Sequence, residues 1–170
     1  MAEELSRSLS GRPVEFSFVS IVPVRIESAG ALIYCITTNR YLFLLRNGLK
    51  FSGTWSIPGG KVEPGETVID TLKRELLEEI NFQLNEEKLI PLETYTATNQ
   101  NFAYHTFIII VDREFTPILN DEHKGYAWTE ITDIPKPIHP GLFKTIRLEE
   151  IKQKLRTMES QSLTRITVSF

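Results

Sequence analysis

Thiol groups are almost missing from this 170-residue sequence, in which Cys35 is the single cysteine. One thiol can form neither an internal disulfide nor a Cys-rich zinc site. The three histidines, His105, His123 and His139, are isolated and lack the i, i+4 pairing of a helical zinc motif. These absences argue against a disulfide-stabilised secreted protein and a zinc domain, and they favour the reducing cytoplasm. Cys35 itself is predicted to be a small core residue.

Long apolar runs and a surplus of basic residues are missing too. No run approaches the roughly 20 apolar residues that a membrane helix needs, so no membrane partner is expected. Nineteen Lys and Arg residues against 22 Asp and Glu residues give a net charge of -3. No overall basic field therefore attracts anionic lipid or long nucleic acid, and a polyanionic ligand would have to be bound locally.

The length and the composition, with 41% apolar and 24% charged residues, fit one globular domain. The first residues lack the basic start and the apolar stretch of a secretory signal. We therefore expect a flexible leader over residues 1–12, a single domain over 13–160, and a tail over 161–170 whose order the sequence leaves open.

Two kinds of periodicity divide this domain. Apolar residues at steps of three and four predict helices at 66–80 and 148–158. Runs of β-branched and aromatic residues between turn residues predict strands at 16–25, 31–37, 41–46, 92–98, 104–111 and 126–129. This order predicts an α/β (α+β) fold, in which helices pack on the faces of a sheet. The second helix either packs on that sheet or forms a short seam between the subunits of a homodimer.

Residues 55–82 combine a turn-rich loop with the first helix. Five of the eight residues from 58 to 65 are proline or glycine, namely Pro58, Gly59, Gly60, Pro64 and Gly65. Such a loop bends sharply, and its glycines let the backbone approach a ligand closely. The loop therefore predicts a binding site beside the start of the helix.

Three carboxylates share one face of this helix. At about 100° per residue, Glu75, Glu78 and Glu79 fall within about 100° of arc and point into the same space. Like charges at these spacings cost about 0.2–0.5 kcal/mol per pair, and an anion in the last turn costs roughly 0.3–1 kcal/mol. A solvated acidic face leaves both costs in place, whereas a hard divalent cation removes them. We therefore interpret the three glutamates as ligands of Mg²⁺ or Mn²⁺.

The spacing around these glutamates resembles the Nudix box, the signature of Nudix hydrolases. The positions that carry the resemblance are Gly60, Glu66, Arg74, Glu75, Glu78, Glu79 and Phe82, preceded by the similar Trp55, Pro58 and Gly59. One position departs, because Asn81 stands where the family usually has glycine. That position is the C-cap of the helix, where a left-handed residue is needed and asparagine is the best substitute for glycine.

The resemblance implies a fold, an activity and a cofactor. The fold would be an α/β/α sandwich with a mixed sheet. The activity would be Mg²⁺- or Mn²⁺-dependent hydrolysis of the phosphoanhydride in a nucleoside diphosphate linked to another moiety. The substrate would be a small nucleotide, with a nucleoside triphosphate, ADP-ribose, a dinucleoside polyphosphate and a capped RNA all open. Two alternatives are a catalytically silent Nudix-like binding module and an isopentenyl diphosphate isomerase, which needs a catalytic Cys beside a metal-binding His motif.

By similarity to the family, Glu75, Glu78 and Glu79 would bind the metal together with the carbonyl group of Gly59. Many relatives place one further carboxylate in a loop after the box. Glu122 occupies such a loop here, so it is a candidate ligand or base, and a solvated loop glutamate is the alternative.

The same similarity assigns the catalytic roles. The carboxylate that acts as general base varies within the family, and we assign it to Glu75. Arg74 would hold the glutamates by salt bridges, with Glu66 as a partner, and Gly60 would support the loop. Arg74 and Glu78 complete the predicted catalytic set.

Aromatic residues outside the helix could stack on a nucleobase. Trp55, Tyr104 and Trp128 are the candidates for substrate binding. Aromatic residues in strands are more often core residues, so packing in the interior is the alternative for each.

Overall fold

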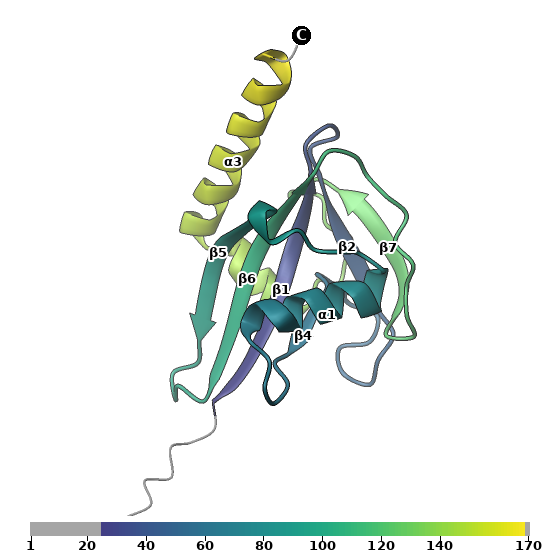
Figure 1. Cartoon of the computed structure of the whole chain (residues 1–170), viewed down its shortest axis with the longest axis vertical. Helices are drawn as coiled ribbons and strands as arrows, with labels where there is room; N and C mark the ends of the chain where they lie inside the picture. Colours follow the sequence, from purple (N-terminus) through teal and green to yellow (C-terminus); the bar gives the residue numbers. More distant parts are fainter. Residues whose placement is uncertain (1–24, 169–170) are drawn as a thin grey trace, which may run out of the picture.

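The computed structural model of the protein describes residues 25–168 (Figure 1). The leader expected at 1–12, nearly all of the strand expected at 16–25, and the last two residues of the expected tail lie outside this range. The described residues form seven strands, three α-helices and one short 3-10 helix. This content confirms the α/β (α+β) prediction.

Two strands, β1 (Ile26–Cys35) and β2 (Arg40–Arg46), lie at the centre of the sheet. β1 pairs in parallel with β6 (Phe102–Val111) along its whole length. β5 (Leu89–Thr96) pairs antiparallel with β6, and β7 (His123–Thr129) pairs antiparallel with β2. The sheet is therefore mixed, as predicted, and its central strands are mostly buried on both faces.

The two central strands separate along part of their length. β6 occupies one edge of β1 throughout, so β2 and β4 (Gly59–Lys61) must share the other edge. There β2 pairs only at residues 34 and 35, and β4 pairs at 28–30. In the same way β1 and β3 (Trp55–Ser56) share one edge of β2, because β7 occupies the other. The segment 55–61 therefore lines a gap that opens between β1 and β2.

Helices cover both faces of the sheet (Figure 1). α1 (Val68–Ile80) crosses one face, α2 (Pro140–Arg147) lies on the other, and a 3-10 turn at Glu86–Lys88 precedes β5. α1 begins with a capping box, in which the Thr67 side chain accepts from the backbone N–H of Asp70 and the Asp70 carboxylate accepts from that of Thr67. The arrangement is the α/β/α sandwich that the Nudix resemblance implies.

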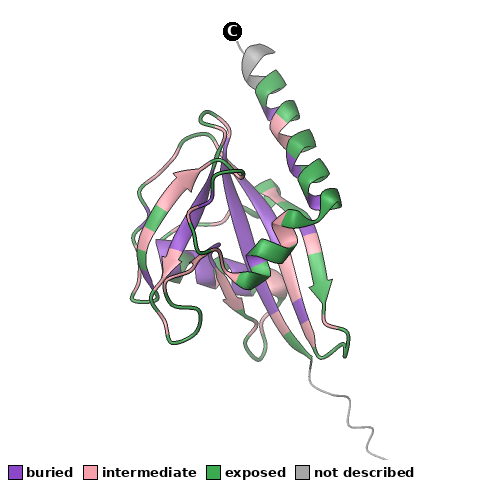
Figure 2. Ribbon diagram, turned by 180° about the vertical axis from the view of Figure 1, so that it is seen from behind, coloured by how far each residue is buried: buried purple, intermediate pink, exposed green. Residues whose placement is uncertain are grey.

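The core lies on both sides of the sheet, and Figure 2 shows its buried residues from behind. On the α1 side, Leu72 and Leu76 pack with Ile33 of β1. On the other side, Leu142 of α2 packs in a cluster that includes Leu32 of β1. Because alternate residues of a strand point to opposite faces, β1 supplies both clusters and joins the layers.

The chain after β7 forms two helices, so the single helix predicted at 148–158 is wrong in its bounds. Pro140 begins α2, where the missing N–H of proline costs no hydrogen bond. Leu148 has an extended backbone and separates α2 from α3 (Glu149–Val168). The predicted helix therefore corresponds to the first part of α3, and α2 was not predicted.

The apolar stripe of α3 packs within the same chain. Ile151 and Leu155 are buried in the core. The Tyr41 hydroxyl donates to Glu159 Oε1 over 2.8 Å, and Lys154 Nζ donates to the carbonyl oxygen of Leu92 over 2.9 Å. These contacts favour packing on the sheet over the dimer seam for this part of α3.

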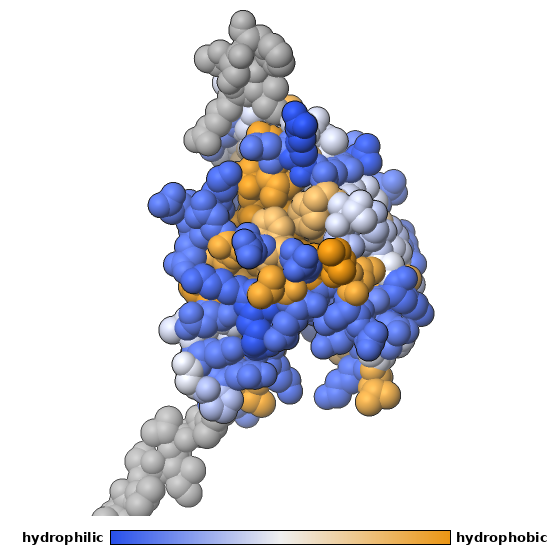
Figure 3. Space-filling view, turned by 45° about the vertical axis from the view of Figure 1, so that its right-hand side comes forward, coloured by the Kyte–Doolittle hydropathy of each residue, from blue (hydrophilic) through white to orange (hydrophobic). Residues whose placement is uncertain are grey.

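The helices and one face of the surface bear on the expectation of no membrane partner. Among residues 25–168, no helix is both long and apolar enough to traverse a bilayer. The face in Figure 3 carries apolar residues near its centre with hydrophilic residues around them. Some apolar exposure is normal for a folded protein, so this area alone assigns no partner.

Asn81 ends α1 in the left-handed conformation, with φ 53° and ψ 40°. Its backbone N–H donates to the carbonyl groups of Leu76 and Leu77. The C-cap predicted from the sequence is therefore confirmed, and asparagine fills the position usually held by glycine.

This cap yields a stability prediction. Asn81→Ala should lower the free energy of unfolding by about 1 kcal/mol, because alanine disfavours the left-handed region. Asn81→Gly is the matched control and should leave that free energy unchanged or raise it, since glycine adopts this conformation freely. Equilibrium unfolding in urea measures both variants. An alanine variant as stable as the wild type would contradict the cap assignment.

Candidate active site

A cavity of about 560 Å³ lies beside the gap between β1 and β2, on the face of the sheet covered by α2. Its floor includes Ser28 and Thr106 of the sheet, and α2 and the loop after β2 contribute walls. Glu75 of α1 and Glu122, just before β7, also line it. The fold thus gathers residues from both halves of the chain at one place.

Gly59 and Gly60 permit two close approaches at the edge of this cavity. A Cβ atom on Gly59, whose φ is 150°, would collide with the carbonyl group of Ala29. A Cβ atom on Gly60 would collide with the carboxylate of Glu75. The first glycine therefore lets β4 lie against β1, and the second lets Glu75 lie against the backbone of β4.

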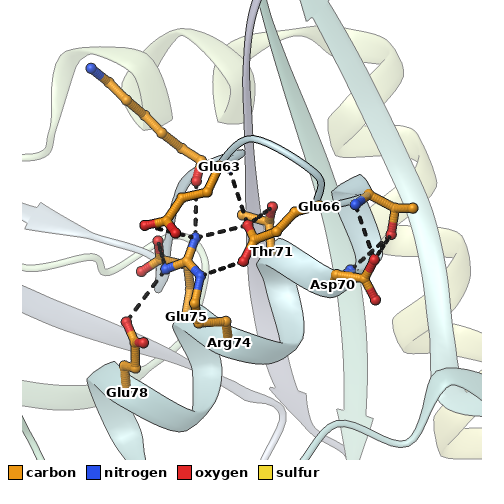
Figure 4. Close-up of polar contacts among 9 residues, drawn as sticks. Glu63, Glu66, Asp70, Thr71, Arg74, Glu75 and Glu78 are labelled. Carbon is orange, nitrogen blue, oxygen red and sulfur yellow. Dashed lines mark hydrogen bonds and ion pairs between the residues drawn. The ribbon is translucent and has the colours of Figure 1, made fainter.

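Arg74 binds several oxygen atoms around the loop and the helix (Figure 4). Its Nε donates to Glu66 Oε1 over 2.7 Å, and its Nη1 donates to Glu75 Oε1 over 2.8 Å and to Glu78 Oε2 over 3.4 Å. Its Nη2 also donates to the carbonyl oxygen of Lys61 over 3.1 Å. The expected Arg74–Glu66 salt bridge is present, and hydrogen bonding to Arg74 lowers the pKa of Glu66 to about 2. Arg74 therefore ties the loop to the helix and orients Glu75.

The three glutamates of α1 do not all point the same way. The side chains of Glu75 and Glu79 are 11% and 2% exposed, whereas the Glu78 side chain is 56% exposed and lies toward Arg74. Glu79 Oε2 accepts a hydrogen bond of 2.8 Å from the backbone N–H of Gly59. Glu75 and Glu78 thus converge on Arg74 Nη1, whereas Glu79 turns toward Gly59, and the shared metal site of the three glutamates stays a prediction.

The buried carboxylates repel one another. Burial raises the pKa of Glu79 to about 8, and the neighbouring carboxylates of Glu75 and Glu122 add to the rise against the Gly59 hydrogen bond. Burial also raises the pKa of Glu75, opposed by Arg74 and reinforced by Glu78 and Glu122. Glu122 is therefore near enough to both buried glutamates to affect their ionisation.

This donor set suits a hard divalent cation, because carboxylate and carbonyl oxygens are the ligands that Mg²⁺ and Mn²⁺ prefer. Beside Glu79, both ring nitrogens of His123 are buried without a hydrogen-bond partner, and burial lowers the pKa of His123 to about 4. Within residues 25–168, no three Asp, Glu, His or Cys side chains already form an ion site. Arg74 and the Gly59 N–H each bind one oxygen of Glu75 and Glu79, so the other oxygen of each carboxylate remains available to an ion.

Basic side chains line the cavity as well. Arg46 and Lys50 come from the end of β2 and the loop after it, Lys61 comes from β4, and Lys144 comes from α2. Sequence reasoning missed Arg46, Lys50 and Lys144, since no spacing relates residues that only the sheet and α2 bring together. The local positive charge needed for a polyanionic ligand is therefore present despite the acidic net charge.

Of the three aromatic candidates, only Tyr104 lines the cavity. Burial, together with nearby Glu79, raises the pKa of its hydroxyl, so Tyr104 stays a neutral hydrogen-bond donor. Trp55 packs against the core on the α2 side. Trp128 packs on the α1 side, and its Nε1 donates to the carbonyl oxygen of Phe115 over 3.0 Å. Both tryptophans therefore pack against the core, which was the alternative to substrate binding.

Cys35 lies apart from these groups. Its thiol is buried, 3.3 Å from Thr37 Oγ1 and 3.8 Å from the carbonyl oxygen of Asp112. It does not line the cavity. The isopentenyl diphosphate isomerase alternative therefore lacks the catalytic cysteine that it needs.

Comparison with known proteins decides the family. A family model described as the NUDIX domain matches residues 27–148. The chain belongs to the Nudix family. Nucleoside triphosphatase NudI from Escherichia fergusonii is 32% identical over 144 residues, covering 76% of this chain and 95% of that protein. NudI from Salmonella typhimurium is 30% identical over 122 residues, covering 65% and 81%. This Nudix protein is a hydrolase that acts on acid anhydrides.

Solved structures agree with the Nudix fold. A MutT Nudix hydrolase from Burkholderia pseudomallei superposes with a TM-score of 0.61 at 22% identity, over 72% of this chain and 96% of that chain. The Nudix domain of NrtR from Shewanella oneidensis, solved with ADP-ribose, gives 0.62 at 16% identity, over 78% and 89%. At these identities the likeness concerns the fold alone.

The contact of β4 with β1 yields a second stability prediction. Gly59→Ala should lower the free energy of unfolding by about 1–3 kcal/mol, because the new Cβ collides with backbone and the φ of 150° strains alanine. Gly48→Ala is the control, since a Cβ there meets no atom within 4 Å. Urea unfolding of both variants measures the difference. Equal stability would show that β4 can move away from β1 at no cost.

Proposed function

We propose that this Nudix hydrolase is a Mg²⁺- or Mn²⁺-dependent pyrophosphohydrolase of nucleoside triphosphates. One observation carries the proposal. Three carboxylates that repel one another, Glu75, Glu79 and Glu122, lie at a cavity that basic side chains also line. A divalent cation with a polyphosphate satisfies both halves of the site at once. The nucleoside triphosphatases among the relatives support this substrate over ADP-ribose or a dinucleoside polyphosphate.

The size of the cavity supports a small nucleotide. Its volume of about 560 Å³ lies within the usual range of small-molecule sites. Arg46, Lys50 and Lys144 line the same cavity as Glu75, so one polyphosphate in this cavity can contact both cations and an ion on the carboxylates. A single chain supplies all these groups. For the location of the protein in the cell, the cytoplasm remains our expectation.

The proposed ion would be held by Glu75, Glu79, Glu122 and the carbonyl group of Gly59, with Glu78 at the rim. When bound, such an ion neutralises charge on the phosphates and activates water for attack. The remaining roles belong to side chains and backbone groups. The Gly59 N–H orients Glu79, Arg74 orients Glu75, and burial of Glu75 raises its pKa and makes it a better general base.

The proposed metal site predicts the effect of one substitution. Glu79→Gln should lower kcat with nucleoside triphosphates by about 100-fold or more, because a neutral amide replaces an anionic ligand. The free energy of unfolding should stay unchanged or rise, since the amide oxygen can still accept from Gly59 and no buried charge is left. Turnover and urea unfolding are measured on the same samples.

The exposed Glu130→Gln is the control for that substitution and should retain wild-type turnover. Full activity in Glu79→Gln would rule out this site. A variant that loses both activity and stability would place Glu79 in the fold rather than in the chemistry.

Metal binding also predicts a change in stability. Mg²⁺ at 100 times its dissociation constant should add about 2.7 kcal/mol to the free energy of unfolding of the wild type. Glu79→Gln should gain much less from the same addition. EDTA should abolish turnover of the wild type, and Mg²⁺ should restore it. Turnover that survives EDTA, or unfolding that ignores Mg²⁺, would contradict the proposed cofactor.

A further inference from the structure

One carboxylate in the cavity has no part in the proposed hydrolysis. Glu93 of β5 lines the cavity, and its Oε2 atom is buried without a hydrogen-bond partner. None of the salt bridges within residues 25–168 involves Glu93. Because buried polar atoms are nearly always hydrogen-bonded, this oxygen is available to a donor on a ligand.

The register of four neighbouring strands places Glu93 relative to the glycine loop. Gly59 pairs with Gly30, Gly30 pairs with Thr106, and Thr106 pairs with Glu93. Adjacent strands are about 4.8 Å apart, so the Cα atoms of Gly59 and Glu93 lie about 14 Å apart across the sheet. Paired residues face the same side of a sheet. Glu93 therefore faces the cavity that begins at the Gly59 loop, three strands away from it.

Aromatic side chains lie next to Glu93 on the same face. Tyr95 of β5 is two residues from Glu93 and pairs with Tyr104 of β6. The rings of Tyr95 and Phe102 have centroids 6.5 Å apart, and all three aromatic residues line the cavity. Such rings provide stacking surfaces for a nucleobase. A nucleotide with its phosphates near the Gly59 loop can thus extend its base toward β5.

We propose that Glu93 determines which nucleobase is bound, by accepting a hydrogen bond from an exocyclic amino group of the base. The inference rests on the proposed function, which places the phosphates at the other end of the cavity. An ionised carboxylate offers only acceptors. It therefore accepts a hydrogen bond from an amino group such as that of cytosine. A carbonyl oxygen in the same position, such as that of uracil, repels it.

Matched nucleotides test this proposal, because dCTP and dUTP differ at the amino or carbonyl group, and dGTP and dITP differ by the 2-amino group. The wild type should have the higher kcat/KM for the amino member of at least one pair. Glu93→Gln, which offers a donor as well as an acceptor, should reduce that preference by about 10-fold. The change should appear mainly in KM, since Glu93 is remote from the phosphates. The exposed Glu87→Gln is the control and should keep the wild-type ratio.

Binding of the products separates this proposal from the proposed function. Dissociation constants of dCMP and dUMP, and of dGMP and dIMP, are measured by calorimetry in the wild type and in Glu93→Gln. A base preference that depends on Glu93, without turnover of any triphosphate, would support the role of Glu93 and overturn only the proposed function. Turnover with the same ratios in both proteins would overturn only the role of Glu93.

Two further outcomes would also contradict the proposal that Glu93 determines which nucleobase is bound. A wild type that prefers the carbonyl or amino-free member of both pairs contradicts the proposed hydrogen bond. A comparison of CTP with dCTP tests the sugar as the alternative donor. A Glu93→Gln variant that alters this ratio, and leaves the base ratios unchanged, would assign the carboxylate to the ribose.

Discussion

The close contact of β4 with β1 positions the rest of the site. Because Gly59 and Gly60 have no Cβ atoms, the backbone of β4 lies against β1 on one side and against the Glu75 carboxylate on the other. The Gly59 N–H then reaches Glu79, and the carbonyl group of Lys61 reaches Arg74. Hydrogen bonds between backbone groups of β4 and charged side chains of α1 thus fix the loop, the helix and the sheet to one another.

Burial of carboxylates has opposite consequences for stability and for function. Desolvation raises the pKa of Glu75 and Glu79, so keeping them ionised costs free energy. Arg74 and the Gly59 N–H offset part of this cost by binding one oxygen of each carboxylate. The residual repulsion is what a divalent cation would relieve. The same burial that weakens the folded state therefore strengthens the proposed affinity for metal.

Local features of the site could be predicted from the sequence, and features that depend on long-range register could not. The α1 helix, its Asn81 cap and the Arg74–Glu66 pair follow from spacing within one short segment, so periodicity and the family resemblance located them. The positions of Arg46 and Glu93 beside one cavity follow from which strands pair and at which residues. No sequence pattern carries that register. The helix α2 was missed for a different reason, because it begins at Pro140 and Gly141, two residues that are typical of a loop.

The net charge of -3 conceals a separation of charge within the site. Residues 60–82 hold six acidic and three basic residues, so the rest of the chain is neutral overall. Two of these acids, Glu75 and Glu79, belong to the proposed ion site, and Arg46, Lys50 and Lys144 line the same cavity as Glu75. On charge alone, a basic side chain is expected wherever the wall of this cavity lies next to the phosphates of a bound polyphosphate. Glu93 breaks that rule, and a negative side chain is tolerable only where the phosphates do not reach. Its place across the sheet from Gly59 therefore argues that the uncharged part of the nucleotide lies there.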